Sequence, residues 1–172
     1  GYVFKSNCGI RGDLEINDDF DINKDEEDRL AEMKATFASF NGLDDKWKYL
    51  ISLAKSHMPM SSEYKKEDYI VPGCSTTMYL VPKCDGQTMH FELGVEVTGS
   101  QPLISLGLGV LALKIYNDAT PKEILSVDKK FFESIGLNVG LTPTRNNGFA
   151  SILDKIYKSA TVYSMIYDKK PE

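Results

Sequence analysis

Apolar residues recur at helical spacing in the first third of the chain. Residues 30–40 carry an apolar side chain at every third or fourth position, which predicts an amphipathic helix that Asn41-Gly42 ends. A second helix is predicted over residues 43–58 by the same spacing, and Pro59 ends it. The two helices are expected to pack their apolar stripes against one core.

The middle of the chain has the pattern of a β-hairpin. Residues 76–81 are strand-like, and Asp85-Gly86 is a favoured two-residue turn. Apolar and polar residues then alternate from residue 88 to residue 97, which predicts a strand with one buried face. The predicted buried face consists of Met89, Phe91, Leu93, Val95 and Val97.

The second half of the chain is predicted to be helical. Residues 103–116 are apolar nearly all round, so we expect a buried central helix, with Ser100 able to cap it. Thr120-Pro121-Lys122-Glu123 has the order of a capping box with a first-turn proline. A short helix is expected from Asp128 to Gly136.

The last predicted helix begins at Thr142-Pro143. Its expected inner face consists of Phe149, Ile152, Leu153, Ile156, Ala160 and Tyr163. Together these elements predict an α+β fold, in which a small antiparallel sheet has helices packed on one face. Glycines 107 and 109 inside the central helix are interpreted as sites of close backbone packing.

Charge divides the chain into two predicted parts. Residues 1–28 are rich in Asp and Glu and poor in periodicity, so we interpret them as an acidic, flexible tail. Residues 29–172 are predicted to form a single domain, and the chain of 172 residues is long enough for a proper core.

The overall composition narrows the classes of function. Apolar residues make up 42% of the chain and charged residues 26%, which is ordinary for a soluble globular protein. The formal net charge of -5 argues against non-specific binding to nucleic acid. The longest apolar run, residues 102–116, contains Lys114 and is too short to span a membrane.

Cys74 is the first candidate for chemistry. The chain has three cysteines, an odd number that does not make a disulfide framework in a domain of this size. Cys74 follows Pro72-Gly73, so a tight turn before the first strand presents its thiol. The alternative is a buried cysteine that fills space. Cys84, beside the hairpin turn, is expected to be exposed and without a role, and Cys8 lies in the acidic tail.

Two other uses of the cysteines are weaker hypotheses. Cys74, Cys84, His57 and His90 supply ligand types for zinc, but no ligand pair has the spacing of a zinc motif, so no metal is predicted. A cysteine hydrolase would need a base near Cys74, and only His57 is a conceivable one.

Arg145 is a cation in the first turn of the last predicted helix. The positive end of the helix dipole disfavours a cation there, so Arg145 is expected either to pair with a carboxylate or to meet a partner. The sequence leaves both readings open.

Several segments in order resemble the SufE family of sulfur acceptors, over about residues 44–157. Residues 47–55 are similar to the opening helix of that family, and residues 71–81 resemble its glycine-cysteine loop and following strand. A stretch similar to the apolar helix of the family begins at Gly107, and residues 116–125 resemble its Y-x-x-x-T-P-x-x-I segment. Residues 141–149 closely follow the signature L-T/S-P-S-R-x-x-G-L/F.

The resemblance implies a SufE/IscU-like fold and a sulfur-carrying role. In this reading Cys74 accepts persulfide sulfur from a SufS-like cysteine desulfurase, which it also stimulates, and passes the sulfur to a SufBCD-like scaffold. Gly73, Gln101 and Arg145 are the implied partner-binding residues, and no cofactor is implied. A cluster scaffold or metal-binding protein of similar fold is the alternative.

The sequence also departs from the family pattern near the expected contact with the sulfur donor. Gln101 stands where many members have aspartate, and Leu106 stands where they have a basic residue. Ser75 and Tyr79 replace a frequent glutamine and tryptophan. The acidic segment, together with a start that fits a chain whose targeting segment has been removed, favours a plastid-type organelle (apicoplast or chloroplast), while a bacterial cytoplasm explains the core equally well.

Overall fold

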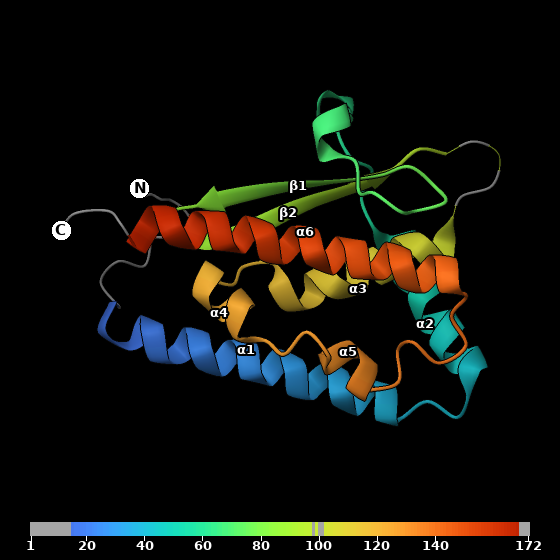
Figure 1. Cartoon of the computed structure of the whole chain (residues 1–172). Helices are drawn as coiled ribbons and strands as arrows, with labels where there is room; N and C mark the ends of the chain where they lie inside the picture. The colour runs from blue at the N-terminus through green and yellow to red at the C-terminus, as the bar shows by residue number, and fades with distance from the viewer. Residues whose placement is uncertain (1–14, 98, 100–101, 169–172) are drawn as a thin grey trace.

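The computed structural model describes residues 15–97, 99 and 102–168 of the chain, and side chains from residue 25 to residue 166. Six helices and a two-stranded sheet make up the described part, with two short 3₁₀ turns at residues 62–64 and 67–69 between α2 and β1 (Figure 1). The elements are α1 (Glu15–Ala38), α2 (Leu43–Ser56), β1 (Met78–Asp85), β2 (Thr88–Val95), α3 (Leu103–Tyr116), α4 (Pro121–Ser126), α5 (Phe131–Ser134) and α6 (Pro143–Asp168).

The predicted hairpin is confirmed. β1 and β2 pair antiparallel from Met78 opposite Val95 to Asp85 opposite Thr88. Gly86 in the turn has a φ of 79°, a left-handed conformation that favours glycine. The alternation along β2 also holds, because Met89, Phe91, Leu93 and Val95 are buried. Val97 lies beyond the end of β2 and is 52% exposed, so its assignment to the buried face was wrong.

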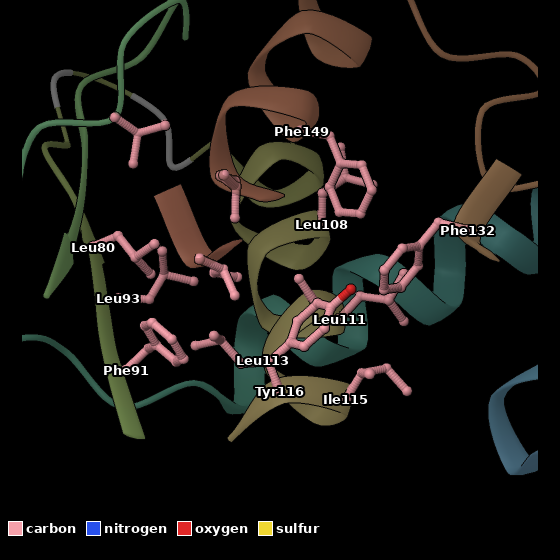
Figure 2. Close-up of a cluster of buried hydrophobic side chains, with 14 of the residues drawn as sticks. Leu80, Phe91, Leu93, Leu108, Leu111, Leu113, Ile115, Tyr116, Phe132 and Phe149 are labelled. Carbon is pink, nitrogen blue, oxygen red and sulfur yellow. The ribbon is translucent and has the colours of Figure 1, made fainter. Parts of the chain in front are cut away.

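The two faces of the sheet have different covers. Leu80, Phe91 and Leu93 point from the sheet toward α3 in Figure 2, and α6 also packs on this side. On the other face, Tyr79 and Val81 form a small separate cluster with Met60, which lies just before the two 3₁₀ turns. Helices therefore cover one face, as predicted for this α+β fold, while a short irregular segment covers the other.

Helix α3 is the centre of the core, as its composition predicted. Its residues are buried along most of their length, and it packs against α1, α2, α6 and β2. A Cβ atom on Gly107 would come within 2.8 Å of the backbone carbonyl carbon of Leu50, so the predicted close packing is confirmed there. Within the described residues, no helix has the combination of length and apolar character needed to cross a bilayer.

The predicted capping box begins α4. The hydroxyl oxygen of Thr120 accepts a hydrogen bond of 3.1 Å from the backbone N–H of Glu123. The carboxylate of Glu123 in turn accepts one of 2.8 Å from the backbone N–H of Thr120. Pro121 stands at the first helical position, where its missing N–H costs nothing. The other predicted cap, Ser100, lies outside the described residues.

The first helix is longer than the sequence pattern indicated. It begins at Glu15 rather than near residue 30, so the predicted division at residue 28 falls inside one continuous helix. Glu26, expected in a solvated tail, is only 5% exposed. Arg29 donates hydrogen bonds to the carbonyl oxygens of Ile115 (3.2 Å) and Asn117 (2.5 Å), which ties α1 to the end of α3. Residues 1–14 of the predicted tail lie outside the described residues.

Candidate functional site

Cys74 lies in a short loop that is anchored at both ends. On one side, the backbone N–H of Val71 donates a 2.8 Å hydrogen bond to the carbonyl oxygen of Met78. On the other side, the N–H of Glu96 donates one of 2.9 Å to the carbonyl oxygen of Thr77. Residues 72–76 between these anchors make no hydrogen bond to other described residues. The loop is therefore held by packing alone, between two fixed ends.

The thiol of Cys74 faces a small cavity where three elements meet. The cavity lies between the loop, α3 and the first turns of α6, and its free volume is about 10 Å³, roughly the space of one water molecule. Figure 1 shows the loop before β1 beside the N-terminal end of α6. The lining residues are Cys74, Ser75, Met78, Ser105, Leu108, Thr144, Arg145, Gly148, Phe149 and Ile152.

Two glycines let the loop approach α6 closely. Gly73 has a φ of 81°, a backbone conformation that residues with a Cβ atom rarely adopt. Gly148 is buried in α6, and a Cβ atom there would lie 3.1 Å from the Sγ atom of Cys74. Gly148 is the glycine of the signature over residues 141–149, but no role was predicted for it from the sequence. The sequence feature that could have indicated its role is a glycine in the first turns of a helix, because glycine there destabilises the helix by about 1 kcal/mol relative to alanine.

The surroundings of Cys74 favour the neutral thiol. Burial raises the pKa of Cys74 above the ordinary value for cysteine. Its thiol makes no hydrogen bond to another described residue. The described lining residues include no His, Asp or Glu, so none of them is a base for the thiol. In this closed position Cys74 is therefore protected rather than activated.

Arg145 lines the same cavity as Cys74. Its backbone N–H donates a 3.2 Å hydrogen bond to the hydroxyl oxygen of Thr142, so it stands in the first turn of α6 as predicted. Its side chain is exposed, and none of the ion pairs among the described residues involves it. The pairing reading of Arg145 thus finds no partner carboxylate in the described part of the chain.

A buried lysine holds the segment that leads into α6. Lys46 is 4% exposed, and its Nζ donates 3.0 Å hydrogen bonds to the carbonyl oxygens of Gly136 and Leu137 and a further one to Val139. Burial lowers the pKa of this ammonium group, and three carbonyl dipoles offset part of the cost. Lys46 therefore helps to fix the position at which α6, and with it Arg145, begins. A lysine on a helix gives no sequence signal for this role.

The other candidate residues lie apart from the cavity. Cys84, expected to be exposed, is half-buried and packs against the core because the hairpin end folds onto it. The ring of His57 donates a 2.7 Å hydrogen bond from Nε2 to the carbonyl oxygen of Leu93, and His90 is exposed on β2. Within the described residues, no three metal-binding side chains gather. Gln101 and Cys8 lie outside the described residues.

Comparison with known proteins agrees with this architecture. A model of the SufE family, described as an Fe-S metabolism associated domain, matches residues 31–160. The chain is 28% identical to an uncharacterized SufE-like protein of Synechocystis sp. over 137 residues, which cover 79% of this chain and 82% of the relative. The solution structure of a hypothetical protein from Thermus thermophilus superposes with a TM-score of 0.64 at 19% identity, covering 80% of this chain and 96% of that one.

The family match spans well over half of the chain, from the end of α1 through most of α6. The protein therefore belongs to the SufE family and has a role in iron–sulfur metabolism. The resemblance read from the sequence is confirmed at this level. The Thermus structure supports the fold.

Proposed function

We propose that Cys74 carries sulfur as a persulfide between a cysteine desulfurase and a scaffold that assembles iron–sulfur clusters. The Cys74 thiolate attacks the outer sulfur of a persulfide on the desulfurase, and a new S–S bond forms at Cys74. The S–S bond of the donor breaks, and its inner sulfur leaves as a thiolate. The outer sulfur moves with no net oxidation or reduction.

The observation behind this proposal is the half-buried position of the Cys74 thiol against a small cavity. The free volume of about 10 Å³ beside it is close to what one added atom needs. A persulfide is easily reduced or oxidised, so walls such as Met78, Leu108 and Phe149 would protect the cargo between loading and delivery. A hydrolase would instead need a base at this thiol, and the described residues of the lining supply none.

Loading requires the Cys74 loop to leave the cavity. Residues 72–76 have no hydrogen bonds to other described residues to break, while the pairs at Val71 and Thr77 keep both ends of the loop in place. A partner that docks at this end of the molecule therefore has only packing contacts to replace. Outside the cavity the thiol regains solvent, so its pKa falls toward the ordinary cysteine value and the fraction of reactive thiolate rises.

The proposal includes two partners and a non-enzymatic role. The desulfurase is SufS-like and is stimulated when Cys74 removes its persulfide, and the receiving scaffold is SufBCD-like. Arg145 and Gly73 are proposed to contact the desulfurase. Arg145 lines the cavity of Cys74, and Gly73 lies in the loop that carries Cys74. Gln101 is proposed for the same contact from the family resemblance. A plastid-type organelle stays a prediction from the sequence.

Mass spectrometry of peptides tests the proposal directly. The protein is incubated with the cysteine desulfurase of the same organism and L-cysteine, and added sulfur is mapped. We expect an added sulfur atom on Cys74, unchanged loading in Cys84→Ser, and none in Cys74→Ser. Wild-type loading of the Cys74→Ser variant would contradict the assignment. A coloured, metal-containing protein after anaerobic reconstitution would instead support the scaffold alternative.

A further inference from the structure

A second hollow opens next to the Cys74 cavity, between α5, the following loop and the start of α6. Its volume is about 400 Å³. We call it the α5–α6 groove. It is lined by Lys129, Lys130, Phe132, Glu133, Leu137, Asn138, Leu141, Asn146, Asn147, Phe149, Ala150 and Leu153.

The floor of the α5–α6 groove is apolar and rigid. Phe132, Leu137 and Phe149 are buried members of the main core. The rings of Phe132 and Phe149 meet edge to face with centroids 5.1 Å apart, and Figure 2 shows the two side chains near each other. Such a floor suits one large apolar side chain of a binding partner.

Phe149 joins the α5–α6 groove to the Cys74 cavity. It lines both hollows, while Arg145 and Gly148 line only the cavity and Asn146 and Asn147 line only the groove. The two hollows thus lie on neighbouring faces of the same turns of α6. A segment seated in the groove would contact the residue that forms one wall of the Cys74 shelter.

The rim of the α5–α6 groove offers polar groups that the chain itself leaves unused. The side-chain amides of Asn138, Asn146 and Asn147 make no hydrogen bond to any described residue. Such amides can pair with the N–H and C=O groups of an extended peptide backbone. Three unpaired amides around one apolar floor therefore favour a peptide segment as the occupant.

The charge of the rim contrasts with the charge of the chain. Lys129 and Lys130 are exposed, and neither takes part in an ion pair among the described residues. Glu133 is the only acidic residue in the groove lining, although the whole chain has a net charge of -5. A segment with carboxylates beside its apolar anchor would be attracted to this rim.

We infer that the α5–α6 groove binds an extended, acidic segment of the cysteine desulfurase, with a large apolar side chain on Phe132 and Phe149. This inference rests on the proposed function, and it names the chemistry by which the donor is recognised. The donor is the proposed source because the groove shares Phe149 with the Cys74 cavity, so a segment bound there lies beside the thiol that the donor must load. Residues 1–14 of this chain fit less well, because Lys5 and Arg11 outweigh Asp13.

Charge reversal on the rim tests the inference. In Lys129→Glu/Lys130→Glu, we expect the concentration that half-saturates stimulation of the cognate desulfurase to rise about tenfold at low salt, and less at high salt. Leu153→Ala and Asn147→Ala should raise the half-saturating concentration by smaller factors. The matched control is Lys34→Glu/Lys122→Glu, which changes the net charge equally at exposed sites away from the groove. The alkylation rate of Cys74 should match wild type in all of these variants. Only Leu153→Ala should lower the melting temperature clearly, because it truncates a side chain packed against the core.

Each outcome separates this inference from the proposed function. If the wild-type chain is loaded with sulfur but the reversed rim leaves half-saturation unchanged, the groove inference is wrong and the carrier role stands. If wild-type Cys74 takes no sulfur from the desulfurase, the carrier role itself fails. An equal loss in the control pair would show a general charge effect and overturn the groove. Sedimentation that shows a wild-type dimer abolished by rim reversal would assign the groove to a second copy instead.

Discussion

Cys74 and Glu26 are both titratable groups whose neutral form is favoured by burial, yet their environments differ. Burial raises the pKa of each group, to about 7 for Glu26. Glu26 lies on a long helix, with its Oε1 3.3 Å from Arg29 and its Oε2 buried without a hydrogen-bond partner. Cys74 lies on a loop held by packing alone. Cys74 can therefore reach solvent without the unfolding of a helix, whereas Glu26 cannot.

This difference determines whether the cost of ionisation lowers the stability of the fold or limits access to a reactive state. Glu26 must ionise inside the packed contact of α1, near the carboxylate of Glu123, so the cost falls on the stability of the fold. Cys74 can ionise after its loop moves into solvent, so the cost falls on access to a reactive state. The acid Glu26 thus lies in a contact that holds the fold together, whereas the thiol of Cys74 lies on a loop that can move.

The largest expected effect is on stability and comes from Glu26→Gln. The unfolded carboxyl loses its proton near pH 4.5, while the folded one keeps it until about pH 7. The folded state therefore binds more protons between these values, and the free energy of unfolding falls as pH rises through this window. We expect wild type to lose roughly 2–3 kcal/mol there. Glu26→Gln should lose much less, so it should be the more stable protein at pH 8.

Urea unfolding at pH 5 and pH 8 measures this difference. Glu27→Gln is the matched control, because Glu27 is exposed on the same helix. It should keep the wild-type dependence on pH. Glu123, whose pKa is also raised chiefly by burial, supplies the dependence that remains in Glu26→Gln. Equal slopes for wild type and Glu26→Gln would mean that the buried position of Glu26 has no energetic consequence.

The next effect concerns the shelter of Cys74. A Cβ at position 148 would already stand 3.1 Å from Sγ, so the branched side chain of Gly148→Val would fill the free volume and exclude the closed loop. We expect Cys74 to react about tenfold faster with iodoacetamide at neutral pH, as its pKa returns toward the ordinary value. Alkylation rates across pH measure both quantities.

Thr161→Val is the control for a valine elsewhere in α6, at an exposed position. It should leave the alkylation rate of Cys74 unchanged. If Gly148→Val also leaves the rate unchanged, the loop must settle against α6 in another way, and the cavity is not what protects the thiol. The contrast with Glu26 would then lose its structural basis.

Local rules were sufficient for the parts of the fold that depend on neighbouring residues. The capping box at Thr120, the hairpin at Asp85-Gly86 and the buried helix α3 follow from sequence patterns and are confirmed. The start of α1 was missed because acidic residues indicate solvent exposure. The burial of Glu26 depends instead on contacts with elements about ninety residues away, such as those of Arg29 with the end of α3.

The candidate site was predictable only in part, for a similar reason. Cys74 and Arg145 could be named separately from the turn and the helix start, but their shared cavity depends on how α6 packs against the loop. The roles of Gly148 and Lys46 were missed, since a helix glycine and a helix lysine have many ordinary explanations. Their roles come from distant partners, the Cys74 thiol for Gly148 and three loop carbonyls for Lys46.

The smallest effect on stability is expected for Arg145→Ala, which tests whether the mouth of the cavity serves a partner. An exposed cation at the start of α6 costs a few tenths to about 1 kcal/mol, so its removal should leave the melting temperature equal or slightly higher. Stimulation of the cognate desulfurase should nevertheless fall severalfold, while the alkylation rate of Cys74 stays at the wild-type value. Steady-state desulfurase assays and alkylation on the same preparations measure both.

Arg145→Lys separates charge from geometry in this prediction. Lysine keeps the positive charge but lacks the planar fork of donors, so partial recovery of stimulation would indicate a bidentate contact with the partner. Full recovery would indicate attraction by charge alone. Unchanged stimulation in Arg145→Ala would exclude the docking role. A sharp fall in melting temperature would show instead that Arg145 anchors the fold, and its exposed position, without an ion pair in the described part of the chain, argues against that outcome.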